Sequence, residues 1–102
     1  MQYDETRFAE GPDGTRLFYG LVGPQDPVAS PGAPAIVLTD GIGCDGFAWK
    51  YLGPHLAKSH RVLHWHYRAH GRSGLPVDPA RIDVASHARD LVGIVMRRLS
   101  SL

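Results

Sequence analysis

Cysteine pairs, long apolar runs and an excess of charge of one sign are all missing from this sequence. Cys44 is the single cysteine among 102 residues, which excludes an intrachain disulfide, a paired-cysteine zinc motif and a redox Cys-x-x-Cys motif. The longest apolar runs are about five residues, against the roughly 20 that a membrane-spanning helix needs. The 11 basic and 10 acidic residues leave a net charge of +1, too balanced to indicate binding to nucleic acid or to an anionic membrane.

Targeting signals are missing as well. The first five residues, Met-Gln-Tyr-Asp-Glu, lack the basic start and the apolar run of a signal peptide. With a single cysteine, this favours a reducing compartment, and we expect a cytoplasmic protein. No motif in the sequence indicates a cofactor, so none is expected.

What is present is typical of a globular α/β protein. The chain is 43% hydrophobic and 21% charged, as in proteins that bury a core. Residues 1–23 are expected to form an N-terminal hairpin, with strands at 6–10 and 15–22 joined by a Gly-Pro-Asp-Gly turn. Residues 24–34 contain four prolines and are expected to form an irregular loop.

Residues 35–102 show the alternating pattern of αβ units. Residues 35–39 and 61–67 are rich in β-branched, apolar or aromatic residues and predict two strands. A short helix restarting at Pro54 is expected between them. Asp83 can cap a last helix, whose expected apolar face contains Val84, Ala88, Leu91, Val95 and Leu99.

Two motifs in this pattern resemble the α/β-hydrolase superfamily. Residues 36–43, Ile-Val-Leu-Thr-Asp-Gly-Ile-Gly, are similar to the family's third strand and its His-Gly turn. Residues 66–73, His-Tyr-Arg-Ala-His-Gly-Arg-Ser, are similar to the family's Asp-x-Arg-Gly-His-Gly-x-Ser loop. The resemblance implies the N-terminal portion of an α/β-hydrolase sheet, covering nearly the whole chain.

The resemblance also assigns roles to residues of the first motif. By resemblance, the backbone N–H of Ile42, in the turn that begins at Gly41, helps to stabilise the oxyanion of an ester-like small-molecule substrate. Trp49 and Phe47 are candidates for a substrate pocket, although aromatic side chains at such positions also fill cores. The glycines could alternatively serve only to make a tight turn.

The second motif is interpreted mainly as a structural loop. Arg68, His70 and Ser73 offer polar groups that can satisfy an irregular backbone. Ser73 does not match the nucleophile elbow, because Leu75 stands where that elbow needs a glycine.

The sequence departs from the family pattern at three positions. Asp40 stands in place of the family's histidine, His66 in place of its aspartate, and Ala69 in place of a glycine. We therefore hypothesise a direct contact between Asp40 and His66.

The catalytic serine, acid and base of the family have no counterpart here. No Gly-x-Ser-x-Gly motif occurs, so we expect a fragment of an esterase-like or lipase-like hydrolase that is inactive alone. In the family the third strand pairs with the fifth, so residues 35–38 are expected to form an exposed sheet edge that favours self-association.

Other interpretations remain open. His64 and His66 face one side of a strand and could bind zinc with neighbouring ligands, although no ligand spacing is diagnostic and no metal is expected; the candidate neighbours are Asp40, Cys44, Asp45 and His70. Cys44 is more easily explained by packing than as a nucleophile. The alternatives to an enzyme are a noncatalytic binding or assembly module and a gene remnant.

Overall fold

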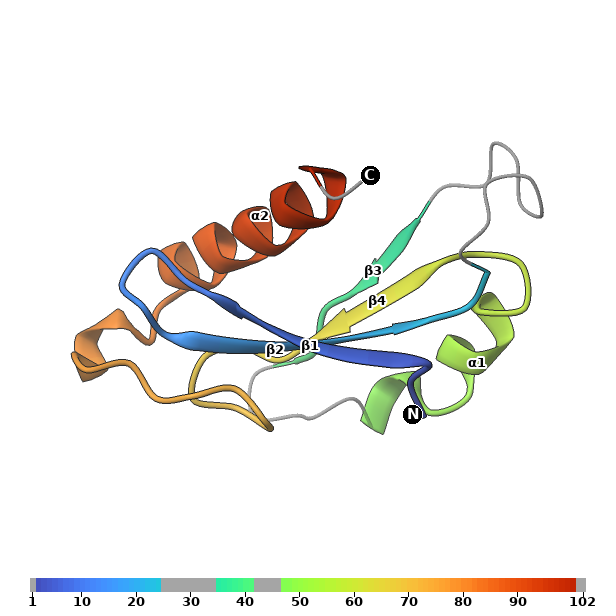
Figure 1. Ribbon diagram of the computed structural model, residues 1–102. Coiled ribbons are helices and arrows are strands. Elements are labelled where there is room, and N and C mark those ends of the chain that lie inside the picture. Colours follow the sequence, from blue (N-terminus) through green and yellow to red (C-terminus); the bar gives the residue numbers. More distant parts are fainter. Residues whose placement is uncertain (1, 25–34, 42–46, 101–102) are drawn as a thin grey trace.

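Four strands form one mixed sheet in the computed structural model, which describes residues 2–24, 35–41 and 47–100. The strand order is β1-β2-β4-β3, and helices lie on both sides of the sheet (Figure 1). The elements are β1 (Glu5–Glu10), β2 (Arg16–Val22), β3 (Ile36–Leu38), the 3-10 turn η1 (Phe47–Trp49), α1 (Leu52–Leu56), β4 (Val62–Trp65), the 3-10 turn η2 (Pro79–Arg81) and α2 (Val84–Ser100). This α/β architecture confirms the predicted fold class.

The predicted N-terminal hairpin is present. β1 and β2 pair antiparallel, with Phe8 opposite Phe18. Gly14 has a φ of 85°, which glycine adopts without steric cost, and it closes the turn between the strands. The Asp13 carboxylate accepts hydrogen bonds from the backbone N–H and the hydroxyl of Thr15, which fixes the exit from the turn.

The two strands predicted from the apolar segments lie side by side. β4 pairs antiparallel with β2 and parallel with β3, with Leu38 opposite His64. β3 and β4 are both shorter than the predicted segments, 35–39 and 61–67. Among the described strands β3 is at the edge of the sheet, as expected, and its Val37 side chain is 38% exposed.

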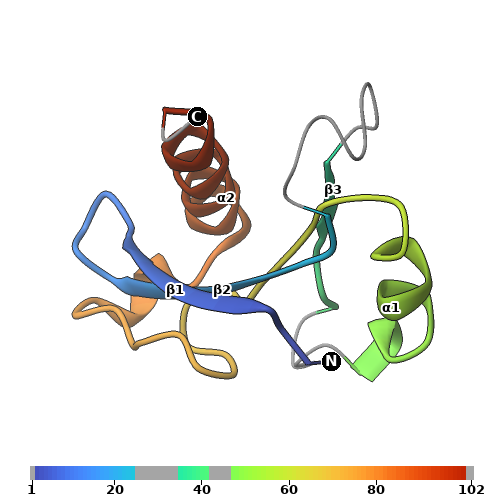
Figure 2. The same cartoon turned by 45° about the vertical axis from the view of Figure 1, so that its right-hand side comes forward.

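The two faces of the sheet differ in chemistry. On the face covered by α2, Tyr19, Leu63 and Trp65 pack with Ile94 of the helix in the apolar core (Figure 2). Side chains alternate along a strand, so β4 presents His64 to the opposite face. A buried histidine there needs polar partners, and this face contains the site described below.

The helix between β3 and β4 begins earlier than predicted. α1 starts at Leu52, and Pro54 is its third residue. The first backbone N–H groups of a helix have no partner within the helix, so a proline is tolerated there and does not mark the start. No helix of the described ranges is long and apolar enough to cross a membrane.

The last helix is present, but its predicted buried face is partly wrong. As expected, the Asp83 carboxylate accepts a hydrogen bond of 2.7 Å from the backbone N–H of Ser86. However, Val84 is 81% exposed, whereas Asp90 and Ile94 are each 1% exposed. The helix is rotated so that Asp90 points into the protein, because a buried arginine binds it there.

Candidate functional site

The segment that leaves β3, Thr39–Gly41, is held by side chains of β4 and the loop after it. Trp65 donates its indole N–H to the Thr39 hydroxyl over 3.1 Å. Tyr67 donates its hydroxyl to the backbone carbonyl of Asp40 over 2.6 Å. Asp40 is buried and Gly41 is exposed, so the chain reaches the surface at Gly41, immediately after a fixed residue.

The Asp40 side chain ends a chain of hydrogen bonds. Its Oδ1 lies 2.8 Å from Nε2 of His64, and both side chains are almost fully buried, at 2% and 1% exposed. Nδ1 of His64 lies 2.6 Å from the Tyr3 hydroxyl. A neutral His64 satisfies both contacts if Tyr3 donates to Nδ1 and Nε2–H donates to Asp40.

The hypothesised contact between Asp40 and His66 is therefore wrong in its partner. The hydrogen bond of Asp40 goes to His64, two residues earlier on the same face of the strand. Sequence position alone cannot separate the two histidines, because alternate residues of a strand share a face.

His66 has a different environment. Its Nδ1 lies 2.9 Å from the backbone N–H of Arg72, which can only donate. Nδ1 must therefore be the unprotonated nitrogen of the neutral ring, and Nε2 carries the proton. The ring also packs against Phe18, with centroids 4.7 Å apart.

This tautomer argues against a metal centre. Candidate ligand atoms of Asp40, His64 and His66, all buried, lie within 4.8 Å of one another. However, a metal on Nε2 of His66 would have to displace the proton that the Arg72 contact requires there. Of the other suggested ligands, His70 places its Nδ1 2.9 Å from the carbonyl of Arg68, while Cys44 and Asp45 lie outside the described residues.

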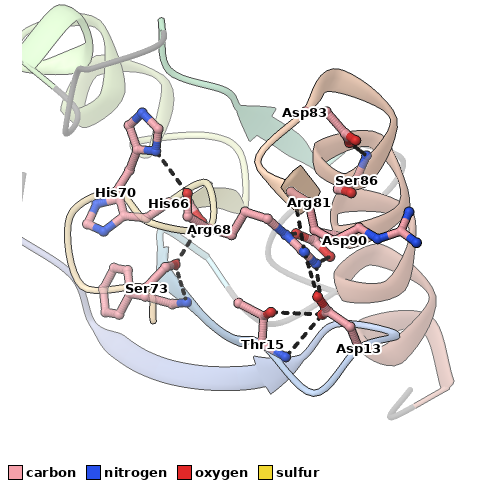
Figure 3. A network of polar contacts seen from close by, with 11 residues as sticks. Asp13, Thr15, His66, Arg68, His70, Ser73, Arg81, Asp83, Ser86 and Asp90 are labelled. Atoms are coloured by element: carbon pink, nitrogen blue, oxygen red, sulfur yellow. Dashed lines mark hydrogen bonds and ion pairs between the residues drawn. The ribbon is translucent and has the colours of Figure 1, made fainter. Parts of the chain in front are cut away.

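Arg68 is the centre of a second, separate network (Figure 3). Its guanidinium binds both carboxylate oxygens of Asp90 at 2.8 Å and both of Asp13, at 2.8 and 3.1 Å. With a further bond to the carbonyl of Arg81, all five N–H donors are used. This fully bonded arginine joins the hairpin turn, the loop after β4 and α2.

The charges in this network reinforce one another. Hydrogen bonds from Arg68, and then from Thr15, hold the pKa of Asp13 well below its usual range. Hydrogen bonding to Asp90 is the largest cause of the raised pKa of Arg68. No sequence pattern indicated Asp13 or Asp90 as partners of Arg68, because they lie 55 and 22 residues from it along the chain.

The remaining loop residues support the backbone. Ser73 accepts a hydrogen bond from the backbone N–H of Phe18 and donates one to the carbonyl of His66, so its hydroxyl is occupied. Ala69, in place of the family's glycine, has a φ of 64° in the left-handed region. Gly71, at φ 50°, leaves no space for a Cβ, which would lie 2.3 Å from Nδ1 of His66.

A third group of rings lies beside Tyr67. The centroid of the Tyr67 ring lies 4.4 Å from that of His87 and 5.5 Å from that of His70. Burial, and then the nearby charge of Asp40, raises the pKa of the Tyr67 hydroxyl. Burial and the proximity of His70 lower the pKa of His87. Both groups therefore favour their neutral forms.

The proposed pocket residues are only partly placed. Phe47 is 78% exposed and Trp49 is partly buried, both on the turn η1 before α1. Ile42, the expected oxyanion donor, lies outside the described residues. The sequence analysis did not identify Tyr3 or Tyr67 as site residues. Trp65 and Tyr67 are two residues apart, and this alternation could have indicated that Tyr67 shares the face of Trp65, which contacts Thr39.

Comparisons with known proteins identify the fold. No protein-family model matches the sequence, and no curated protein matches it significantly. Among solved structures, the enol-lactonase from Burkholderia xenovorans is 31% identical with a TM-score of 0.70, over 86% of this chain and 31% of that one. A hydrolase from Pseudomonas aeruginosa is 26% identical with a TM-score of 0.74, over 94% and 33%.

A third structure extends the match. An α/β hydrolase from Novosphingobium aromaticivorans is 24% identical with a TM-score of 0.78, over 96% of this chain and 33% of that one. The chain thus spans about a third of the length of the proteins it matches. Together with the sheet order, these matches make this chain the N-terminal part of an α/β-hydrolase fold.

Proposed function

We propose that this chain supplies the oxyanion turn of an ester-hydrolysing enzyme whose nucleophile, acid and base come from residues outside this sequence. The observation that carries the proposal is the fixed Thr39–Gly41 segment at the end of a parallel strand, where hydrolases of this fold place an oxyanion donor. The proposed substrate is a small ester-like molecule. One of the similar structures is an enol-lactonase, and a lactone is an internal ester.

The geometry supports this function better than a metal-dependent or a serine-dependent one within the chain. The histidine tautomer disfavours a metal centre, and the Ser73 hydroxyl is already bonded on both sides. Phe47 and Trp49 follow the turn and are proposed to contact the substrate.

A chimera tests the proposal. Residues 1–102 replace the matching N-terminal segment of the Burkholderia xenovorans enol-lactonase, and hydrolysis of a p-nitrophenyl ester is followed. Ile42→Pro removes one backbone N–H and is expected to lower kcat about 100- to 1000-fold. Ile42→Val keeps that N–H and is the matched control.

Two results would contradict the proposal. One is a folded chimera that hydrolyses no ester while the parent lactonase does. The other is equal activity of the two Ile42 variants. The unfused chain is expected not to react with a fluorophosphonate probe, and labelling of any serine would overturn its dependence on an outside nucleophile.

A second candidate function is a binding module that pairs through β3. The observation that favours it is the position of β3 at the edge of the described sheet, with Val37 partly exposed. Sedimentation of the purified chain tests it: Val37→Lys should reduce self-association, and an unchanged monomer in both proteins would argue against it.

A further inference from the structure

Side chains of β4 and of the loop after it converge on the segment 39–41 from both sides of the sheet. Trp65 and Tyr67 reach it from the α2 side, and His64 reaches it from the opposite side. The contacts fall on different atoms: the Thr39 hydroxyl, the Asp40 carbonyl and the Asp40 carboxylate. Such a segment is held against rotation as well as displacement.

One of these contacts falls on the peptide immediately before Gly41, and a second holds the Asp40 side chain. The Tyr67 hydroxyl bonds the Asp40 carbonyl, which belongs to the same peptide unit as the Gly41 N–H. A peptide unit is planar, so fixing its carbonyl also fixes the direction of its N–H. His64 holds the Asp40 side chain on the other side and is itself held by Tyr3.

We propose that Tyr67 and His64 are positioning residues that set the direction of the Gly41 N–H, at the start of the proposed oxyanion turn. The inference rests on the proposed function for its catalytic meaning. The proposed donor is the N–H of Ile42, in the peptide unit that follows Gly41, and an oxyanion donor is effective when it is oriented before the charge develops. Tyr67 and His64 hold the peptide unit immediately before that one.

Asp40 takes a specific part in this arrangement. The family pattern has a histidine at this position and an aspartate at position 66, and this chain has the reverse. The structure accommodates the exchange through His64, whose Nε2–H points at the Asp40 carboxylate. An oxygen acceptor at position 40, rather than its negative charge, is then the requirement.

The experiment measures the order of the Gly41 amide by NMR in the full 102-residue chain. Tyr67→Phe is isosteric and removes only the hydroxyl, so the fold is retained. The order parameter of Gly41 should fall from the rigid range, about 0.85, to below about 0.6. Tyr51→Phe, at an 82% exposed tyrosine, is the matched control and should change nothing.

A second pair of variants tests the part of His64. Asp40→Asn keeps an oxygen that accepts from Nε2–H and should leave Gly41 rigid, whereas Asp40→Leu removes the acceptor and should not. The 15N spectrum of His64 should show a neutral ring protonated at Nε2. A Gly41 order parameter that is the same in Tyr67→Phe and Tyr51→Phe, or in both Asp40 variants, would overturn the proposal.

Activity in the lactonase chimera separates this proposal from the proposed function. Tyr67→Phe should lower kcat about fivefold with KM unchanged, as for the loss of one hydrogen bond. A loosened Gly41 with unchanged kcat would overturn the catalytic meaning. If the chimera is inactive in every form, the proposed function fails, and the order parameters alone decide whether the two residues hold the turn.

Discussion

Replacing Ala69 by glycine is expected to stabilise this protein, although alanine is usually the more stabilising residue. Ala69 has a φ of 64°, where a side chain costs about 1–2 kcal/mol relative to the right-handed region. Glycine loses more freedom on folding, which costs roughly 0.5–1 kcal/mol. The backbone N–H of Ala69 donates to the carbonyl of Gly74 over 2.8 Å, and a glycine at position 69 keeps this N–H. The net gain is therefore about 0.5–1 kcal/mol.

Urea denaturation followed by circular dichroism measures this change, and thermal unfolding should show a rise in Tm of roughly 2–8 °C. Ala88→Gly is the matched control, since Ala88 is exposed on α2 in a helical conformation. The same chemical change there should destabilise by about 1 kcal/mol. If both variants shift the midpoint in the same direction, the backbone at residue 69 does not carry the expected strain.

The remaining predictions concern glycine, buried charge and pH. Gly71→Ala should destabilise by about 2–3 kcal/mol in urea, because its Cβ would displace the His66 ring. Arg68→Met should cost about 3–5 kcal/mol by the same measurement, because it leaves Asp90 buried without its partner. The pKa of Asp13 is lowered by folding, so its contribution to stability is fully present above its usual pKa near 4 and is lost as the pH falls below that value. Asp13→Asn should therefore weaken the pH dependence of the urea midpoint between about pH 5 and 2. The pKa of His87 is also lowered, so stability should fall as the pH drops below about 6.5, and His87→Phe should remove this fall.

The order of the elements could be predicted because local patterns determine it. Branched apolar runs at 36–38 and 62–65 form β3 and β4, and the Gly-Pro-Asp-Gly turn joins β1 to β2. The buried face of α2 was harder to predict, because hydrophobic periodicity assigns only apolar residues to the buried face. Asp90 is buried at 1% exposed because Arg68 satisfies it, and that pairing depends on contacts 22 residues apart.

The motifs singled out Asp40 and His66 as exchanged relative to the family, but they did not indicate which contacts the two side chains make. Which histidine meets Asp40 depends on the register of β3 against β4, and that register places Leu38 opposite His64. Tyr3 could not be connected to the site from sequence, because its contact with His64 spans 61 residues.

Neighbouring residues of β4 and the loop after it therefore take part in two different sets of contacts. Trp65 and Tyr67 hold the segment that leads to Gly41, while Arg68 joins α2 to the hairpin turn. Among the described residues, the hydrogen bonds of Arg68 share no atom with those that hold Thr39 and Asp40. Effects at sites without shared partners usually add. A change at Asp13 should thus lower stability without loosening Gly41, whereas loss of the Tyr67 hydroxyl should loosen Gly41 with only a small effect on stability.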